Sequence, residues 1–177
     1  MAVLKVLRYG DPALRRSAAP VGEVTPEVRK IIADMTETMY DEVGIGLAAP
    51  QVGVSLRLIV ISDEEGRGVQ ALLNPAIVDR SGEVTGEEGC LSIPGVFAPV
   101  TRAARVTVEA RSVDGKPLTI EARGLRARVL QHEIDHLDGI LFVTKMRPAD
   151  KTQAKKKLEE LKRRFDESKA APLPSAD

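Results

Sequence analysis

The sequence predicts an α+β fold: a single compact domain in which antiparallel β-sheets surround a central helix, with an N-terminal and a C-terminal helix. Three observations support this prediction. The length of 177 residues suits one hydrophobic core. The apolar patterns run in the order helix, strands, helix, helix, which favours an α+β over an alternating α/β arrangement. A period-two pattern on both sides of a turn signal indicates an antiparallel hairpin.

The first helix is expected to begin at Pro26. Residues 1–25 contain several turn residues, so we expect them to be irregular. Thr25 offers an N-cap hydroxyl, and proline suits the first helical position. Apolar side chains then recur at helical spacing: Val28, Ile31, Ile32, Met35 and Met39. Glycines end this helix, and residues 44–53 are expected to form an apolar loop.

Strands are expected in the middle of the chain. Residues 58–61 form a short apolar run typical of a buried strand. Residues 69–73 predict a second strand, with a continuation over 76–79. Residues 106–110 alternate apolar and polar, and 118–120 return after the Asp-Gly turn at 114–115, so these two segments predict a hairpin.

Two further helices follow. One, of about 13 residues, is expected to follow Gly124 and to end near Asp138-Gly139, where glycine suits a C-terminal cap. The other is expected from about residue 150 to Phe165, with an apolar stripe along one face. Residues 1–168 are expected to form the domain. The small, proline-containing residues 169–177 are expected to be a disordered tail.

The composition excludes several classes of protein. Lysine plus arginine and aspartate plus glutamate both number 26, so a wholly basic, nucleic-acid-coating surface is excluded. No segment approaches the roughly 20 apolar residues that span a bilayer, so we expect no membrane contact. The N-terminus does not look like a signal peptide. Cys90 is the lone cysteine, which excludes an intramolecular disulfide. We therefore expect a complete, cytoplasmic protein.

The strongest chemical signal is His132-Glu133-Ile134-Asp135-His136 on the central helix. Residues four apart share a helix face, so both imidazoles can bind one metal ion while Glu133 acts on a bound water. The chain has two histidines in all. Leu125 and Val129 continue the same face, so we expect this face to be the buried one.

A catalytic site of this kind needs a third ligand and an open position. Cys90, an aspartate or a glutamate could supply the third ligand. A cysteine nucleophile paired with one histidine is a competing hypothesis, but it leaves the second histidine unexplained. A general metallopeptidase or a non-enzymatic, metal-stabilised binding module would also contain a helix of this kind.

Three segments together resemble the bacterial peptide deformylase family. They are Gly44-Ile-Gly-Leu-Ala-Ala-Pro-Gln51, Glu88-Gly-Cys-Leu-Ser92 and Gln131-His-Glu-Ile-Asp-His136, and their order and separations are also similar to that family. The resemblance covers about residue 3 to Arg147. It implies a hydrolase that removes the formyl group from the N-terminal formyl-methionine of newly made polypeptides and releases formate.

The resemblance also implies the roles of the site residues. Cys90, His132 and His136 are the implied metal ligands, and a metal-bound water is the nucleophile. Glu133 is the implied acid–base residue, and Gln51 with the backbone N–H of Leu91 is expected to hold the oxyanion. The implied ion is one Fe²⁺ per chain, for which Zn²⁺, Ni²⁺ or Co²⁺ can substitute.

A substrate-binding region is expected next to these residues. Gly44 and Gly46 lack side chains and so allow an extended peptide to approach. The predicted walls for the methionine side chain are Ile45, Leu91, Leu125 and Val129. Arg128 departs from the family pattern, and we expect it to reach the cavity mouth and attract peptide groups. Glu88 and Arg102 are expected to form an ion pair behind the ligands.

The charge is unevenly distributed along the chain. Residues 145–169 contain ten lysines and arginines against five acids, a net charge of +5, so the remaining residues carry −5. A solvated amphipathic helix explains this pattern. Contact between this basic C-terminal helix and the ribosome is the functional interpretation, because the implied substrate is a polypeptide still being made.

Overall fold

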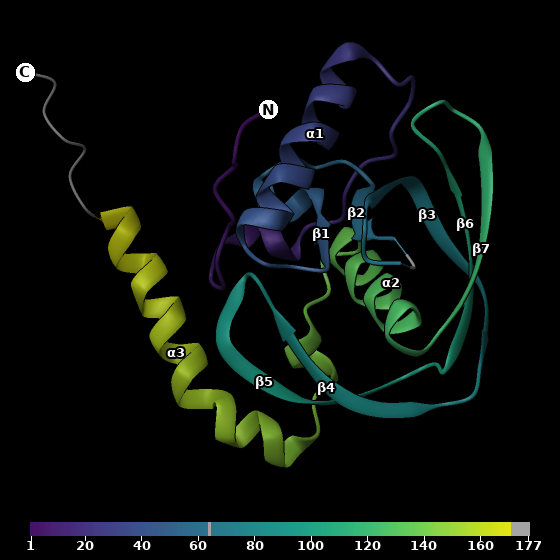
Figure 1. Ribbon diagram of the computed structural model, residues 1–177. Coiled ribbons are helices and arrows are strands. Elements are labelled where there is room, and N and C mark those ends of the chain that lie inside the picture. Colours follow the sequence, from purple (N-terminus) through teal and green to yellow (C-terminus); the bar gives the residue numbers. More distant parts are fainter. Residues whose placement is uncertain (64, 171–177) are drawn as a thin grey trace, which may run out of the picture.

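The computed structural model describes residues 1–63 and 65–170 (Figure 1). A five-stranded antiparallel sheet has the order β1-β2-β3-β6-β7, and β4 and β5 pair as a separate two-stranded sheet. Figure 1 shows helix α2 between the two sheets. The strands are β1 (Gly46–Ala48), β2 (Leu58–Ser62), β3 (Val69–Ser81), β4 (Val84–Cys90), β5 (Ile93–Arg102), β6 (Arg105–Arg111) and β7 (Pro117–Arg123). The predicted α+β architecture around a central helix is therefore confirmed.

Helix α1 (Pro26–Asp41) begins where the sequence predicts. The hydroxyl of Thr25 accepts a hydrogen bond from the N–H of Val28 at 3.3 Å, which satisfies one of the free donors of the first turn. The side chains of Met35 and Met39 are fully buried against β1 and β2. The helix therefore covers one face of these strands, and α2 packs on the opposite face.

The second predicted strand continues through Asn74-Pro75 to form the 13-residue β3. Asn74 has a positive φ of 51°, and the pairing of β3 with β6 shifts its register there. The Asn74 side chain holds the residue in place, because Oδ1 accepts from the N–H of Val21 at 2.7 Å and Nδ2 donates to the Val21 carbonyl at 2.9 Å. The predicted hairpin of β6 and β7 is also confirmed.

The β4–β5 hairpin was not predicted as a pair of strands. Glycine and proline occur throughout it, at Gly86, Gly89, Pro94, Gly95 and Pro99, and such residues normally indicate loops. The hairpin places Cys90 at the last position of β4, immediately before its turn. The expected loop 44–53 likewise contains β1 and a short 3₁₀ helix, Ala49–Val52.

Helix α2 (Gly124–Leu137) ends just before the predicted Asp138-Gly139 cap. Gly139 has a φ of +71°, and a Cβ there would lie 2.5 Å from the Arg15 carbonyl oxygen, so a larger residue does not fit. The prediction that the histidine face is buried along its whole length is wrong at Leu125, which is 66% exposed. Leu125 lies in the first turn, at the rim of a cavity, whereas Val129 is half-buried one turn later.

Helix α3 (Pro148–Ala170) is longer than the predicted segment at both ends. Leu161 is buried in a cluster with Leu14, Val100 and Phe142, which attaches the helix to β5 and to a short 3₁₀ helix, Phe142–Lys145. Residues 171–177 of the expected tail lie outside the described residues. None of the helices within residues 1–63 and 65–170 has the length and apolar character needed to span a bilayer.

Candidate metal centre

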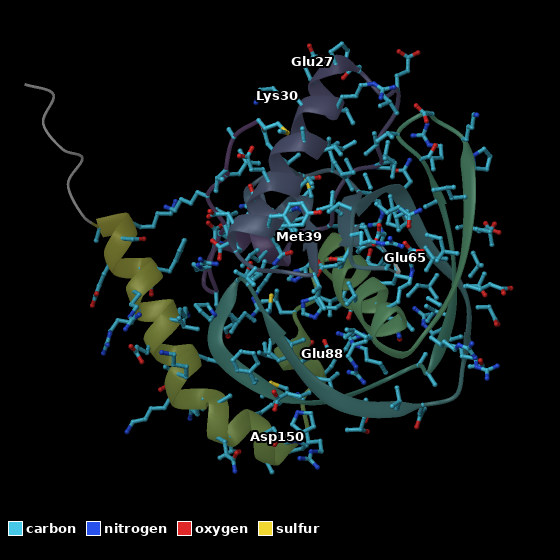
Figure 2. The ribbon with its side chains drawn as sticks, in the orientation of Figure 1. Glu27, Lys30, Met39, Glu65, Glu88 and Asp150 are labelled. Atoms are coloured by element: carbon cyan, nitrogen blue, oxygen red, sulfur yellow. The ribbon has the colours of Figure 1, made fainter. Side chains whose placement is uncertain are left out.

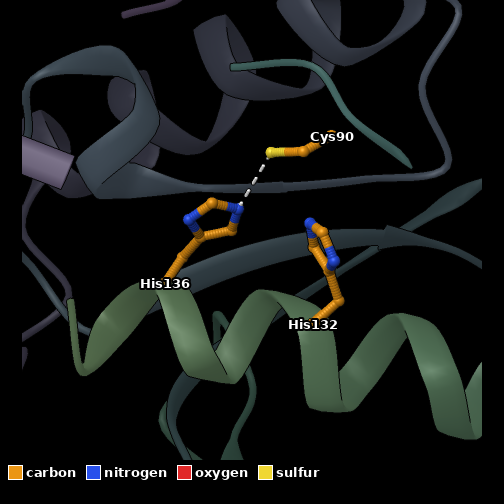
Figure 3. Close-up of side chains that lie close together, drawn as sticks. All are labelled: Cys90, His132 and His136. Atoms are coloured by element: carbon orange, nitrogen blue, oxygen red, sulfur yellow. Dashed lines mark hydrogen bonds between the residues drawn. The ribbon is translucent and has the colours of Figure 1, made fainter. Parts of the chain in front are cut away.

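The scarce residues noted in the sequence converge on one point. Cys90 comes from the end of β4, and His132 and His136 come from successive turns of α2 (Figure 3). One ligand atom from each lies within 4.8 Å of the other two. The Cys90 Sγ is 3.4 Å from Nε2 of His136, and the two imidazole centroids are 5.0 Å apart. Three candidate ligands from two distant segments therefore face one small volume.

This donor set fits a divalent transition metal. Nδ1 of His132 lies 2.9 Å from Oε1 of Glu88, which leaves Nε2 directed toward the common point. Metal-binding histidines typically use one ring nitrogen for the ion and the other for a carboxylate or carbonyl. A thiolate and two imidazoles leave a position open for water or substrate, as in catalytic rather than structural sites.

The two histidines differ in their electrostatic surroundings. Burial lowers the pKa of His136 well below its ordinary value. Burial acts in the same direction on His132, but hydrogen bonds to Cys90 and Glu88 outweigh it and raise its pKa to about 10. A metal ion bound to Nε2 takes the place of that proton, so metal binding releases a proton.

Glu88 is surrounded by donors from β5 and α2. Its carboxylate accepts from Nε and Nη2 of Arg102, both at 2.8 Å, which confirms the expected ion pair. It also accepts from Nη1 of Arg128 at 2.6 Å. Burial raises the pKa of this carboxyl group, but the opposing effects of Arg102 and His132 are together larger and lower it. Figure 2 marks Glu88 inside the molecule, close to β4.

Glu133 is also buried next to the candidate ligands, but within the described part of the chain its carboxylate lacks arginine donors like those that surround Glu88. Its Oε2 has no hydrogen-bond partner among the described residues, and burial raises the pKa of this carboxyl group to about 7. Gly46 lies against it, because a Cβ at that position would be 2.7 Å from Oε1 of Glu133. The close approach seen at Gly46 is therefore that of the Glu133 side chain, and the approach of a peptide there stays a prediction.

The amide of Gln51 is held in one orientation. Its Oε1 accepts from the N–H of Ala48 at 2.9 Å, so Nε2 points the other way. There Nε2 donates to Oγ of Ser92 at 3.1 Å and lies 3.7 Å from Sγ of Cys90. Gln51 is therefore a fixed donor at the edge of the ligand cluster.

A cavity of about 580 Å³ opens over the cluster. Its lining includes every substrate-binding residue predicted from the sequence, together with the predicted catalytic residues and two of the three ligands: Gly44, Ile45, Gly46, Gln51, Cys90, Leu91, Leu125, Arg128, Val129, His132 and Glu133. His136 lies deeper and is 1% exposed. The cavity thus joins the candidate metal centre to the surface.

Comparison with known proteins identifies the family. A family model described as polypeptide deformylase matches residues 3–152. The chain belongs to the peptide deformylase family. It is 50% identical over 165 residues to a peptide deformylase of Alkalilimnicola ehrlichii, with 92% of this chain and 93% of that protein covered.

Solved deformylase structures have the same fold. A peptide deformylase from Legionella pneumophila is 45% identical, with a TM-score of 0.85 over 97% of this chain and 100% of that chain. The peptide deformylase from Thermus thermophilus is 42% identical, with a TM-score of 0.86 over 92% and 99%. This chain is thus an enzyme that removes the formyl group from the N-terminus of newly made polypeptides. The family assignment therefore rejects two hypotheses left open by the sequence, a general metallopeptidase and a non-enzymatic binding module.

Arg128 of this deformylase does not extend to the cavity mouth as expected. It is 8% exposed, and its guanidinium is turned inward to Glu88 and to the carbonyls of Val84 and Val100. A buried carboxylate and two strand carbonyls hold the charged group more strongly than solvent at the rim. The side chain still lines one wall of the cavity.

The sequence did not reveal how the N-terminal segment supports the deformylase site. The N–H of Leu7 donates to the Gln51 carbonyl, and the N–H of Tyr9 donates to the Ser92 carbonyl, both at 2.7 Å. Between them, the guanidinium of Arg8 donates to the Leu91 carbonyl. These bonds connect the Gln51 segment with the turn after Cys90. The bonds of Leu7 and Tyr9 use backbone groups on both sides, which leave no pattern in the sequence.

Replacing Cys90 by serine is expected to weaken metal retention. A neutral hydroxyl is a much poorer ligand for a transition metal than a thiolate. Dialysis against a chelator, followed by metal analysis, should show faster loss from Cys90→Ser than from the unchanged enzyme. In the unchanged enzyme the thiol should react with a thiol reagent only after metal removal. A fully metallated serine variant would remove Cys90 from the ligand set.

Proposed function

We propose that the cavity residues of this deformylase divide the reaction between proton transfer and charge stabilisation. The observation that carries the proposal is that Glu133, Gln51 and Leu91 line the same cavity as Cys90 and His132. Cys90, His132 and His136 would hold a divalent metal ion, which would supply Lewis acidity and lower the pKa of a water molecule in the cavity toward ~7.

Glu133 is the proposed acid–base residue. It is 5% exposed, and burial brings the pKa of its carboxyl group to about 7, so it can both accept and return a proton near neutral pH. It takes a proton from the attacking water and then gives one to the nitrogen of the leaving amine. Its unpartnered Oε2 supports this role, because no described residue competes for the proton.

Gln51 and the backbone N–H of Leu91 are the proposed oxyanion donors. Attack on the formyl carbon places negative charge on its oxygen. One fixed donor directed at that charge is worth ~3 kcal/mol in the transition state. Nε2 of Gln51 has two hydrogens, and the bond to Ser92 uses one of them. The second hydrogen faces Sγ of Cys90, 3.7 Å from Nε2, and we propose that the substrate oxygen takes the place of this long contact.

The remaining cavity residues are proposed to bind the formyl-methionyl end of the polypeptide. Gly44 and Gly46 line the cavity and would offer backbone groups to an extended peptide, and Leu91 and Val129 would provide apolar walls for the methionine side chain. Ile45 and Leu125 are 48% and 66% exposed at the rim, so they would contact residues nearer the surface. A tight space around the formyl hydrogen would exclude an acetyl group.

Fe²⁺ is the proposed resident ion, one per chain, and Zn²⁺, Ni²⁺ or Co²⁺ can replace it. A thiolate with two imidazoles suits all four ions, so the choice of iron rests on resemblance to the family. We further propose that the enzyme works in the cytoplasm, where a reducing environment keeps Cys90 as a free thiol.

The basic helix α3 is proposed to contact ribosomal RNA. Between α3, the Phe142–Lys145 turn and the N-terminal segment lies a groove of about 520 Å³. Its lining includes the basic residues Arg15, Lys151, Lys155 and Lys162, together with the acid Glu159. The groove concentrates positive charge that attracts phosphate groups, and such contact would keep the enzyme near emerging polypeptides.

The acid–base proposal predicts that Glu133→Gln retains its metal but loses turnover. The expected fall in kcat is about 10²- to 10⁴-fold, because a general base contributes about that much. Formate release from formyl-Met-Ala-Ser measures it, with acetyl-Met-Ala-Ser as the substrate that should not react. Glu109→Gln, at an exposed position of β6, is the matched control. Near-full activity of Glu133→Gln would refute the assignment.

The iron proposal predicts that enzyme purified without oxygen contains Fe²⁺ and loses activity in air. A ferrous thiolate site can be oxidised, whereas zinc has no redox change. Zinc-loaded enzyme is therefore the control and should stay active in air. Equal stability of the two preparations would argue against iron.

The α3 proposal predicts weaker ribosome binding after combined charge reversal at Lys151, Lys155 and Lys162. All three are exposed, so the fold should persist. Co-sedimentation at several salt concentrations should show a smaller salt dependence, by about one unit of slope for each lost phosphate contact. Reversal of Lys5, Arg80 and Lys116 changes the net charge equally and is the control. Equal binding by both triple variants would exclude the groove.

A further inference from the structure

Arg128 joins α2 to the hairpin that carries Cys90. It lies on α2 one turn before His132, and its buried guanidinium makes three hydrogen bonds. Nη1 donates to Oε2 of Glu88 at 2.6 Å and to the Val100 carbonyl at 2.8 Å, and Nη2 donates to the Val84 carbonyl at 2.9 Å. Val84 belongs to β4 and Val100 to β5, so one side chain of the helix binds both strands.

The hairpin backbone is shaped to receive this guanidinium. A Cβ at Gly86, in the middle of β4, would lie 3.3 Å from Nη2 and 3.4 Å from Cζ of Arg128. Gly86 is paired with Val100, whose carbonyl accepts from the same guanidinium. The planar group therefore lies against the strand, where a larger residue at position 86 would crowd it.

Through Glu88, the hydrogen bonds of Arg128 reach a proposed metal ligand on α2 and another on β4. Glu88, which accepts from Arg128, also binds Nδ1 of His132 through its other oxygen. Two residues after Glu88, β4 ends at Cys90. The β4–β5 sheet is not hydrogen-bonded to the five-stranded sheet among the described residues. Side-chain bridges such as Arg128 therefore help to set the distance between the thiol and the two imidazoles.

Arg102 provides a second bridge, in a different place. It lies at the end of β5 and connects Glu88 with Asp135 of α2, on the other side of His132. Arg102 therefore also joins the hairpin to α2, near the open end of the hairpin and through a carboxylate on each element. Arg128 differs from it because its guanidinium also binds backbone carbonyls of both strands. The two arginines hold Glu88 from β5 and from α2.

We propose that Arg128 is a positioning residue of the metal centre, which slows metal release by fixing the β4–β5 hairpin and Glu88 against α2. The proposal rests on the ligand set proposed above. It differs from the sequence-based expectation, in which Arg128 attracts the substrate at the cavity mouth.

The test measures metal release directly. The zinc-loaded forms of the unchanged enzyme, Arg128→Leu and Arg128→Lys are mixed with a chromogenic chelator, and the rate of zinc transfer is followed. Loss of a residue that holds a ligand's partner typically costs 10- to 100-fold in metal affinity, so release from Arg128→Leu should be at least about 10-fold faster. The rate of zinc release from Arg128→Lys should fall between those of the unchanged enzyme and Arg128→Leu. An ammonium keeps the charge next to Glu88 but does not span three acceptors.

Arg57, which directly precedes β2, offers a control because its guanidinium binds the far end of the same helix. Its guanidinium also binds one carbonyl and one carboxylate, those of Leu137 at 3.1 Å and Asp138 at 2.9 Å, at the far end of α2. Arg57→Leu should lower the unfolding temperature without changing the release rate. This comparison separates a specific effect on the metal centre from general loss of stability.

Each outcome supports or overturns the positioning role of Arg128. Unchanged release from Arg128→Lys and from folded Arg128→Leu would overturn it. So would a raised KM for formyl-Met-Ala-Ser with unchanged release, since that result would assign Arg128 to substrate binding. If zinc release from Arg57→Leu were accelerated as much as release from Arg128→Leu, the positioning role would also be overturned. A Cys90→Ser variant that keeps its metal would instead refute the underlying ligand set, whatever Arg128 does.

Discussion

The buried carboxylate of Glu88 is the interaction on which the arrangement of the site depends. A carboxylate taken out of water is costly unless charged and hydrogen-bonded partners surround it. Here two arginines and a histidine provide them, and they come from β5 and α2. The same partners that offset the burial of this charge bring the hairpin with Cys90 against the helix with His132 and His136. Stability and ligand geometry therefore have a common cause.

Glu88 and Glu133 are both buried close to α2, but their carboxyl groups differ in chemical behaviour because their neighbours differ. Glu88 has several cationic donors, and they lower the pKa of its carboxyl group. Glu133 is equally buried but lacks a partner at Oε2 among the described residues, and burial raises its pKa to about 7. The first therefore stays ionised and serves as a fixed anion. The second can exchange a proton, as an acid–base residue must.

The sequence predicted the parts of the site that depend on local spacing. Two histidines four apart must share a helix face, and the capped start of α1 and the Gly139 end of α2 follow from equally local rules. The β4–β5 hairpin was missed because its glycines are required by packing: Gly89 lies under the ring of Phe97, and Gly86 lies under Arg128. The inward direction of Arg128 and the N-terminal bonds to Gln51 and Ser92 depend on long-range contacts. No window of sequence contains both partners of such a contact.

The separation of the ligands along the chain has a consequence for biogenesis. Cys90 and His136 are 46 positions apart, so translation completes the thiol-bearing hairpin well before the histidine-bearing helix. A growing chain that ends before α2 has a single thiol and neither histidine, and it lacks the ligand set that would hold an ion. The proposed ligand set therefore predicts that metal acquisition comes late in synthesis, after every strand of the large sheet has been made. Loading the ion then links the earlier and later parts of the active centre.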